Sequence, residues 1–242
     1  MARNAVELEI PSDIEKNDVS RILEWAGKQF DDKAGFASSF SPEDVVIIDI
    51  LSKLNSPVKI FTLDTCRLHD ETYRVMEDIR QKYQINIEVY FPDGNRIEKL
   101  ERENGFYSFY QSLEARKECC NIRKVEPLNR ALSKLHAWIT GLRREQSLTR
   151  QALQKVEIDY GHNEIIKINP LLDWSEKQVW DYIQEHNVPY NKLFDKGFTS
   201  IGCAPCTRAI KRTEDIRAGR WWWEDPHHKE CGLHIKIGRL ED

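Results

Sequence analysis

Short apolar segments alternate with helical patterns along most of this chain, and no other feature limits the possible folds as strongly. This order predicts an α/β protein in which a parallel, twisted sheet is flanked by helices on both faces. The predicted strands are Gly35–Ser38, Pro57–Leu63, Ile85–Phe91, His136–Gly141 and Ile165–Ile168. The predicted helices are Asp13–Phe30, a helix that begins after a Ser41 cap, Glu71–Tyr83, Cys120–Leu135 and Trp174–Glu185.

Parallel sheets bind ligands at the carboxyl ends of their strands, which indicates where the chemistry should lie. We therefore expect functional residues in the segments Ser38–Asp44, Leu63–His69 and Gly141–Arg150. Beyond Val188 the regular pattern ends, and Gly and Pro residues interrupt a basic, Trp-rich tail. A tail of about 50 residues builds little core of its own, so we interpret it as an appendage of a single domain.

Several classes of protein are excluded by composition and patterning. The longest apolar run, Val45–Leu51, is interrupted by Asp49 and is too short to cross a membrane. The stretch Met1–Ile10 has no apolar core, so we predict no signal peptide and a cytoplasmic location. The formal net charge of −4 argues against general affinity for nucleic acid.

The six cysteines are an adjacent pair, a C-x-x-C pair and two isolated residues: Cys119 and Cys120, Cys203 and Cys206, Cys66 and Cys231. Two close pairs of free thiols suit a tetrathiolate metal site. The thiolates of a zinc site are usually about two to four residues apart, whereas an iron–sulfur cluster offers each thiolate its own iron. The adjacent pair therefore favours an iron–sulfur cluster, with zinc and unligated thiols as the alternatives.

Positive charge collects locally despite the overall negative balance. Lys and Arg outnumber Asp and Glu in the segments 116–130, 143–150 and 207–220. The first and last of these adjoin the two cysteine pairs, so a shared thiolate site would bring them together. Guanidinium groups match sulfate and phosphate oxygens, so the segments predict an anion site; the alternative is a set of solvated helix faces.

Cys231 is a candidate nucleophile because it stands alone in a basic, histidine-rich context beside Gly232. A thiol with an ordinary pKa of about 8.5 is only slightly ionised at neutral pH, and nearby cations would increase the thiolate fraction. The alternative is a structural thiol, which is also the role we favour for Cys66. The tryptophans at 221–223 are expected to pack the tail.

Five segments together resemble one family closely. They are KECCNIRKVEPL at 117–128, TGLRREQS at 140–147, CAPCTR at 203–208, RAGRWWWE at 217–224 and KECGLH at 229–234. They are similar to the assimilatory adenylyl-sulfate reductases, the cluster-bearing branch of the phosphoadenylyl-sulfate reductase family. The resemblance extends from Lys33 to Ile235.

The resemblance implies an adenine nucleotide α-hydrolase-like sheet at 31–190, preceded by a helical segment at 1–30 and followed by a cluster-binding and catalytic tail at 191–242. It implies a [4Fe–4S] cluster held by Cys119, Cys120, Cys203 and Cys206, with Cys231 as the nucleophile. It also implies a set of substrate-binding residues: Ser39, Phe40 and Ser41 in the phosphate-side loop, Leu63 and Gly141 at the adenine, and Lys124, Arg150, Arg217, Arg220 and His234 at the phosphosulfate or the thiol.

The implied reaction is reduction of adenosine 5′-phosphosulfate to sulfite and AMP in sulfate assimilation. Cys231 would attack the sulfate sulfur, and thioredoxin or a glutaredoxin-like dithiol would resolve the S-sulfocysteine. The oligomeric state stays open, with a homo-oligomer as one possibility.

Two positions depart from the family pattern, which usually has Gly at the positions of Ser41 and Cys66. Because Pro42 follows Ser41, we expect a stiffer loop where the ribose or a 3′-phosphate would be contacted. The same reaction on 3′-phosphoadenylyl sulfate is the nearest alternative. An ATP-pyrophosphatase-type enzyme is disfavoured because the loop at 39–44 lacks both of that class's glycines, and a zinc or redox-sensing module is the remaining alternative.

Overall fold

The computed structural model describes residues 10–16, 18–147 and 150–225. Within that part of the chain, six strands form one sheet in the order β3-β2-β1-β4-β6-β5. The strands are β1 (Ala34–Ala37), β2 (Lys59–Leu63), β3 (Ile87–Tyr90), β4 (Ala137–Ile139), β5 (Val156–Asp159) and β6 (Ile165–Ile168). Every neighbouring pair is parallel except β5 and β6, which are antiparallel.

The expected parallel α/β sheet is confirmed, and one edge strand was missed. All five predicted strands are present; Ile165–Ile168 has the predicted bounds, and the other four are trimmed or shifted by one to three residues. β5 did not stand out in the sequence because Val156 and Ile158 alternate with acidic residues and only one face is buried. A hairpin-like return onto β6 makes this strand antiparallel.

Helices cover both faces of the sheet. One face carries α1 (Val19–Phe30), α2 (Pro42–Lys53), α3 (Asp70–Tyr83) and α7 (Glu176–Glu185), which share a single apolar core with β1 and β4. The segment from Val45 to Ile48 is fully buried, because α2 is surrounded by the sheet and three helices. The other face carries α6 (Glu126–Leu132), which packs on Phe61 and Trp138.

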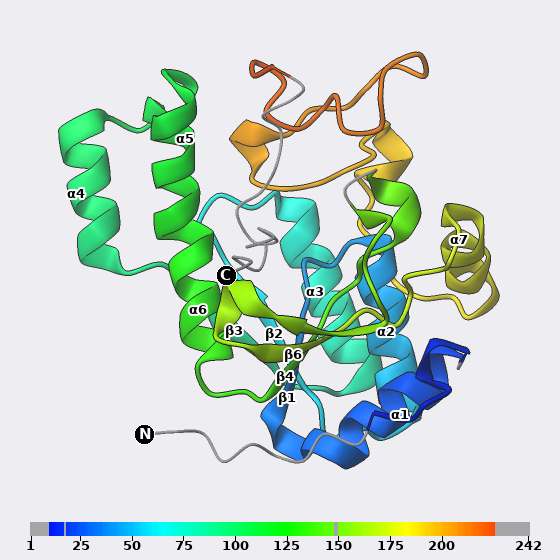
Figure 1. Ribbon diagram of the computed structural model, residues 1–242. Helices are drawn as coiled ribbons and strands as arrows, with labels where there is room; N and C mark the ends of the chain where they lie inside the picture. The colour runs from blue at the N-terminus through cyan, green and yellow to red at the C-terminus, as the bar shows by residue number, and fades with distance from the viewer. Residues whose placement is uncertain (1–9, 17, 148–149, 226–242) are drawn as a thin grey trace.

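A second group of helices stands away from the sheet. Figure 1 shows α4 (Gly94–Asn104) and α5 (Leu113–Cys120) side by side at the left of the molecule. A π-helical turn at Asn121–Val125 joins α5 to α6. The helix predicted at Cys120–Leu135 therefore begins earlier than expected and ends at Leu132. The π-helical turn carries Arg123 and Lys124, both of which border a pocket.

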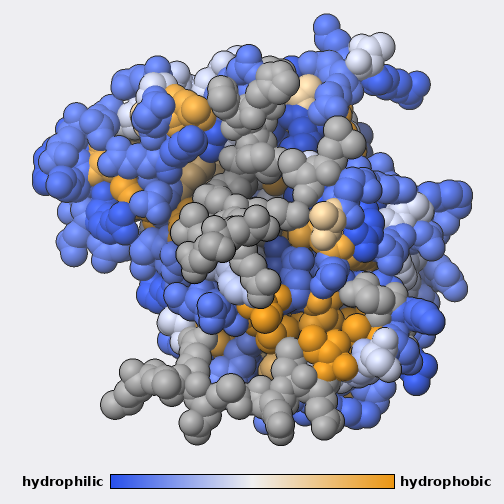
Figure 2. All heavy atoms as spheres, viewed as in Figure 1, coloured by the Kyte–Doolittle hydropathy of each residue, from blue (hydrophilic) through white to orange (hydrophobic). Residues whose placement is uncertain are grey.

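The described part of the C-terminal segment lies over the carboxyl end of the sheet, where Figure 1 shows it as orange and red loops at the top. Short 3-10 turns at Phe194–Lys196 and Ala204–Cys206 are its regular elements. The Ala204 amide donates to the carbonyl of Arg67 at 2.7 Å, which attaches this segment to the loop after β2. In the view of Figure 2 the surface is mostly hydrophilic, with hydrophobic residues exposed in its lower half. No described helix has the length and apolar character required to cross a membrane.

Candidate active site

The segments that follow β1, β2 and β4 enclose a cavity of about 310 Å³ at the carboxyl edge of the sheet. These strands are parallel neighbours, and the strand order reverses between β1 and β4. Such a reversal opens a crevice between the loops, which is where α/β sheets bind ligands. The described C-terminal segment closes the cavity with Ile201, Gly202 and two arginines.

The predicted substrate-binding residues that the structure describes line this cavity, with one exception. They are Ser39, Ser41, Leu63, Lys124, Gly141, Arg150, Arg217 and Arg220. Phe40 instead points into the core, where it is 1% exposed, and its positive φ of 59° turns the loop so that its neighbours face the cavity. Cys231 and His234 lie outside the described residues.

A buried carboxylate organises the loop after β1. The amide and the hydroxyl of Ser39 donate to Asp44 Oδ2 at 2.6 and 2.8 Å. Burial raises the pKa of Asp44 to about 6, although the Ser39 hydrogen bonds oppose that rise. Ser41 occupies the N-cap of α2 as expected, but its side chain makes no capping hydrogen bond. Gly141 packs directly against Asp44, since a Cβ there would overlap Oδ1.

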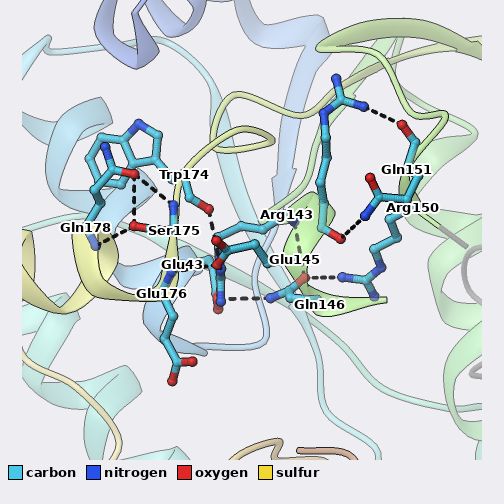
Figure 3. Close-up of polar contacts among 11 residues, drawn as sticks. Glu43, Arg143, Glu145, Gln146, Arg150, Gln151, Trp174, Ser175, Glu176 and Gln178 are labelled. Carbon is cyan, nitrogen blue, oxygen red and sulfur yellow. Dashed lines mark hydrogen bonds and ion pairs between the residues drawn. The ribbon is translucent and has the colours of Figure 1, made fainter. Parts of the chain in front are cut away.

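A polar network joins α2 to the loop after β4 (Figure 3). Glu43 Oε1 accepts from Arg143 Nε at 2.8 Å and from Gln146 Nε2 at 2.9 Å. The amide oxygen of Gln146 in turn accepts from the Arg150 guanidinium. Glu145 Oε2 accepts from Arg143 and from the first amide of α7, Glu176 N, each at 3.0 Å. The network holds the loop that presents Arg150 to the cavity.

The cationic side chains predicted from the three basic segments separate into two groups. Several form ion pairs away from the cavity, including Arg144 with Asp173 and Arg208 with Glu214. Arg143 lines the cavity but is paired there with Glu43. Arg116, 2% exposed in its side chain, pairs with Glu224. The cations along the cavity wall are Lys124, Arg143, Arg150, Arg217 and Arg220. The cavity therefore combines apolar lining residues such as Phe61, Leu128 and Trp138 with several cations, which suits an anionic nucleotide.

A second, smaller pocket contains the thiols of the two cysteine pairs. Its lining is Arg67, Phe109, Arg116, Cys119, Cys120, Arg123, Lys124, Cys203 and Cys206. We call it the four-cysteine pocket. Phe109, Trp221 and Leu100 pack around it as an apolar cluster. Lys124 lines both pockets, so the four-cysteine pocket and the cavity adjoin.

Burial and nearby charges shift the pKa values of the thiols in the four-cysteine pocket in different directions. Burial raises the pKa of Cys206 to about 12 and also raises the pKa of Cys119. At Cys203 burial acts in the same direction, yet its pKa is lowered, because Lys124, Thr65 and two arginines stabilise the thiolate. Thr65 Oγ1 lies 3.2 Å from Cys203 Sγ. Among the described side chains, no three His, Cys, Asp or Glu residues form a group that could hold a metal ion.

Several contacts around these pockets were not predicted from the sequence, although Arg123 was part of the basic segment 116–130. Arg123 Nη1 donates to the Thr65 carbonyl at 2.8 Å, and both Arg67 and Arg123 contact Glu101. The Tyr110 hydroxyl donates to the Pro205 carbonyl at 2.6 Å, which fastens the C-x-x-C turn. Their neighbours in space are distant in the chain, so spacing alone did not reveal them. Cys66 is exposed and lines neither pocket.

The fold and the two pockets define an α/β protein of nucleotide-binding fold, with a thiol-rich pocket beside a cavity lined by cationic residues. The family model for the phosphoadenosine phosphosulfate reductase domain matches residues 33–209. This chain belongs to that family.

Named relatives and a solved structure agree with this assignment. The adenosine 5′-phosphosulfate reductase of Burkholderia cepacia is 46% identical over 231 residues, covering 96% of this chain and 91% of its own. The enzyme of the same name from Neisseria meningitidis serogroup B is 52% identical over 202 residues, covering 83% and 82%. The crystal structure of phosphoadenylyl-sulfate reductase from Candida auris, a phosphate complex, has a TM-score of 0.69 and 31% identity, covering 81% and 91%.

Proposed function

We propose that this protein reduces adenosine 5′-phosphosulfate to sulfite and AMP in sulfate assimilation. One observation carries the proposal: Lys124 is shared between a cationic cavity at the switch point of the sheet and a pocket of four thiols. This arrangement puts anion binding and sulfur chemistry next to each other. The relatives from Burkholderia cepacia and Neisseria meningitidis bear the name of this activity.

We propose a [4Fe–4S] cluster as the resident cofactor of the four-cysteine pocket, on the chemistry of its donor set. Its donor set is four thiols, drawn from two segments far apart in the chain, inside an apolar shell. A cluster gives each thiolate its own iron, so the sulfurs need not converge on one ion as they must around zinc. When bound, the cluster would supply fixed charge beside Lys124 and a covalent link between the two segments. Metal analysis tests it: about four irons with acid-labile sulfide, rather than one zinc, are expected.

The chemistry of the reaction falls to Cys231. Its thiolate attacks the sulfate sulfur, the bond from that sulfur to the bridging oxygen breaks, and AMP leaves as an anion. The product on the protein is S-sulfocysteine. A thiolate of thioredoxin, or of a glutaredoxin-like dithiol, then attacks Cys231 Sγ and releases sulfite. The second thiol of the partner resolves the mixed disulfide, so the dithiol supplies both electrons.

The described residues prepare the substrate for this attack. An anionic nucleophile approaching an anionic substrate needs its repulsion screened, which Lys124, Arg150, Arg217 and Arg220 supply from the cavity wall. The leaving phosphate is stable as an anion at neutral pH, so the step needs no general acid. The backbone at Leu63 and Gly141 borders the cavity where an adenine ring would lie.

Mass spectrometry tests the proposal directly. Protein incubated with adenosine 5′-phosphosulfate, without a dithiol, should gain one sulfonate on Cys231. Cys231→Ser should abolish the adduct and leave the visible absorbance of the cluster intact. An adduct on another cysteine, or loss of absorbance in this variant, would contradict the assignment.

The second candidate is the same reaction on 3′-phosphoadenylyl sulfate, which the Candida auris relative acts on according to its name. The cationic residues that line the cavity favour acceptance of one more phosphate. Comparing kcat/KM for the two nucleotides decides between a strict and a dual enzyme. We also propose that the enzyme is cytoplasmic. Size-exclusion chromatography would determine its oligomeric state.

A further inference from the structure

Trp221 lies against two arginines that belong to different pockets. The guanidinium carbon of Arg116 is 4.6 Å from the ring centroid, and that of Arg220 is also at 4.6 Å. Arg116 lines the four-cysteine pocket, whereas Arg220 lines the cavity. The indole is 1% exposed, so both contacts are made away from water. Desolvated cation–π contacts are the strong ones of their kind.

The backbone of Trp221 is held in an unusual conformation. Its φ is +40°, a left-handed value that bulky residues rarely adopt. The Trp221 amide donates to the carbonyl of Cys206 at 3.1 Å, and an isolated β-bridge joins Thr207 to Arg220. Strained backbone persists where its surroundings enforce it, and such positions cluster at functional sites. With this backbone conformation at Trp221, the indole ring is buried and contacts both arginines.

The two arginines are restrained in different ways. Arg116 is anchored, because its Nε and Nη2 donate to the two carboxylate oxygens of Glu224, each at 2.8 Å. Arg220 Nη1 donates to the Ile201 carbonyl at 3.1 Å, but its buried Nε has no hydrogen-bond partner among the described residues. Its guanidinium packs over Gly202, where any side chain would collide with it. Ring contact is therefore a main restraint on Arg220.

We propose that Trp221 is a positioning residue whose ring fixes the Arg220 guanidinium against the phosphosulfate of the substrate. The Arg116–Glu224 pair fixes the ring in turn, so the arrangement of Arg220 depends on residues of the four-cysteine pocket. The identity of the anionic ligand rests on the function proposed above; the contacts of Trp221 do not.

The test measures ligand affinity without turnover, in holoprotein carrying Cys231→Ser. Trp221→Leu, which removes the aromatic face, should weaken binding of adenosine 5′-phosphosulfate about tenfold. Affinity for adenosine, which lacks both anionic groups, should not change. Trp222→Leu is the matched control, because Trp222 is 48% exposed and its ring contacts are to Tyr110 and Trp223. Visible absorbance of the cluster reports whether the four-cysteine pocket survives each substitution.

A double-mutant cycle with Arg220→Ala separates positioning from general destabilisation. If Trp221 acts through Arg220, the two losses should not add, and Trp221→Phe should retain most of the affinity. Should Trp221→Leu fail to fold, Trp221→Met, which also removes the aromatic face, takes its place in the cycle. Additive effects, or equal losses for phosphosulfate and adenosine, would overturn the role of Trp221. Failure of the parent protein to bind adenosine 5′-phosphosulfate would instead overturn the proposed function.

Discussion

At the scale of single residues, Asp44 is a carboxyl group whose burial at the edge of the sheet destabilises its charged form. Asp44 is 4% exposed, and its carboxylate accepts two hydrogen bonds from Ser39. Those bonds do not offset the loss of hydration, and its pKa rises to about 6. Burying this carboxylate costs free energy of hydration. Gly141 permits the burial, because it has no side chain to collide with Oδ1.

The raised pKa of Asp44 predicts a specific dependence of stability on pH. Because the folded pKa lies above the ordinary value of 3.8, the folded protein binds the proton more tightly than the unfolded chain does. The contribution to stability is complete below about pH 4 and is lost as the pH rises through 6. Lowering the pH from 7 to 5 should therefore stabilise the wild type by about 1 kcal/mol relative to Asp44→Asn.

Urea denaturation of both proteins at the two pH values measures this difference. Carboxylates with lowered pKa values elsewhere act in the opposite direction, but they are common to both proteins and cancel in the comparison. A difference that grew with rising pH would show that Asp44 is stabilised as the anion.

At the scale of elements, the loop after β4 is held to α2 by a buried ion pair. The side chains of Glu43 and Arg143 are 8% and 4% exposed, and Gln146 shares the same carboxylate oxygen. This junction sets the position of Arg150 through Gln146, as Figure 3 shows. Removing one partner of a buried pair leaves the other charge without compensation.

Glu43→Ala should lower the free energy of unfolding by about 3 kcal/mol, since among the described residues Arg143 would keep only the exposed Glu145 as an ionic partner. Substrate affinity should fall as well, because the loop carrying Arg150 would be released. Asp181→Ala is the matched control: its pair with Lys177 is exposed, and about 0.5 kcal/mol or less is expected. Equal losses in the two variants would show that burial of the Glu43 pair is unimportant.

Elements with strong local periodicity were predictable from the sequence, and those defined by distant partners were not. α2 contains the apolar run Val45–Leu51, interrupted by Asp49, and follows the predicted Ser41 cap with Pro42 at its first position; α7 begins at the predicted Ser175 cap. By contrast, α4 is mostly polar, with Leu100 its only buried residue. The sequence also predicted which residue types form the site, namely the cysteine pairs and the cations of the cavity. The contact of Arg116 and Arg220 with Trp221 depends on tertiary packing, which spacing does not encode.

At the scale of the whole molecule, the described C-terminal segment is joined to the sheet domain at the four-cysteine pocket. Cys203 and Cys206 come from this segment, and Cys119 and Cys120 come from the end of α5. The same junction includes the Arg116–Glu224 pair and the Tyr110 hydroxyl on Pro205. A metal cluster held by both pairs would close a long loop, which is where a cross-link restricts the unfolded chain most.

Cys203→Ser should therefore abolish the visible absorbance of the cluster and lower the unfolding temperature by about 5–10 °C. Differential scanning calorimetry of anaerobically purified protein measures the shift. Cys66→Ser is the control, because that thiol is exposed and borders neither pocket. An unchanged unfolding temperature together with lost absorbance would mean that protein contacts alone hold the segment in place.

Lys124 stands on the boundary between the two pockets, and this makes their contents thermodynamically interdependent. Its single positive charge attracts anions on either side, so filling one pocket changes the free energy of filling the other. Linkage requires the effect to be mutual. If the proposed cluster is bound, a saturating nucleotide should therefore alter how readily a chelator removes its iron, although the chelator and the nucleotide act at different pockets.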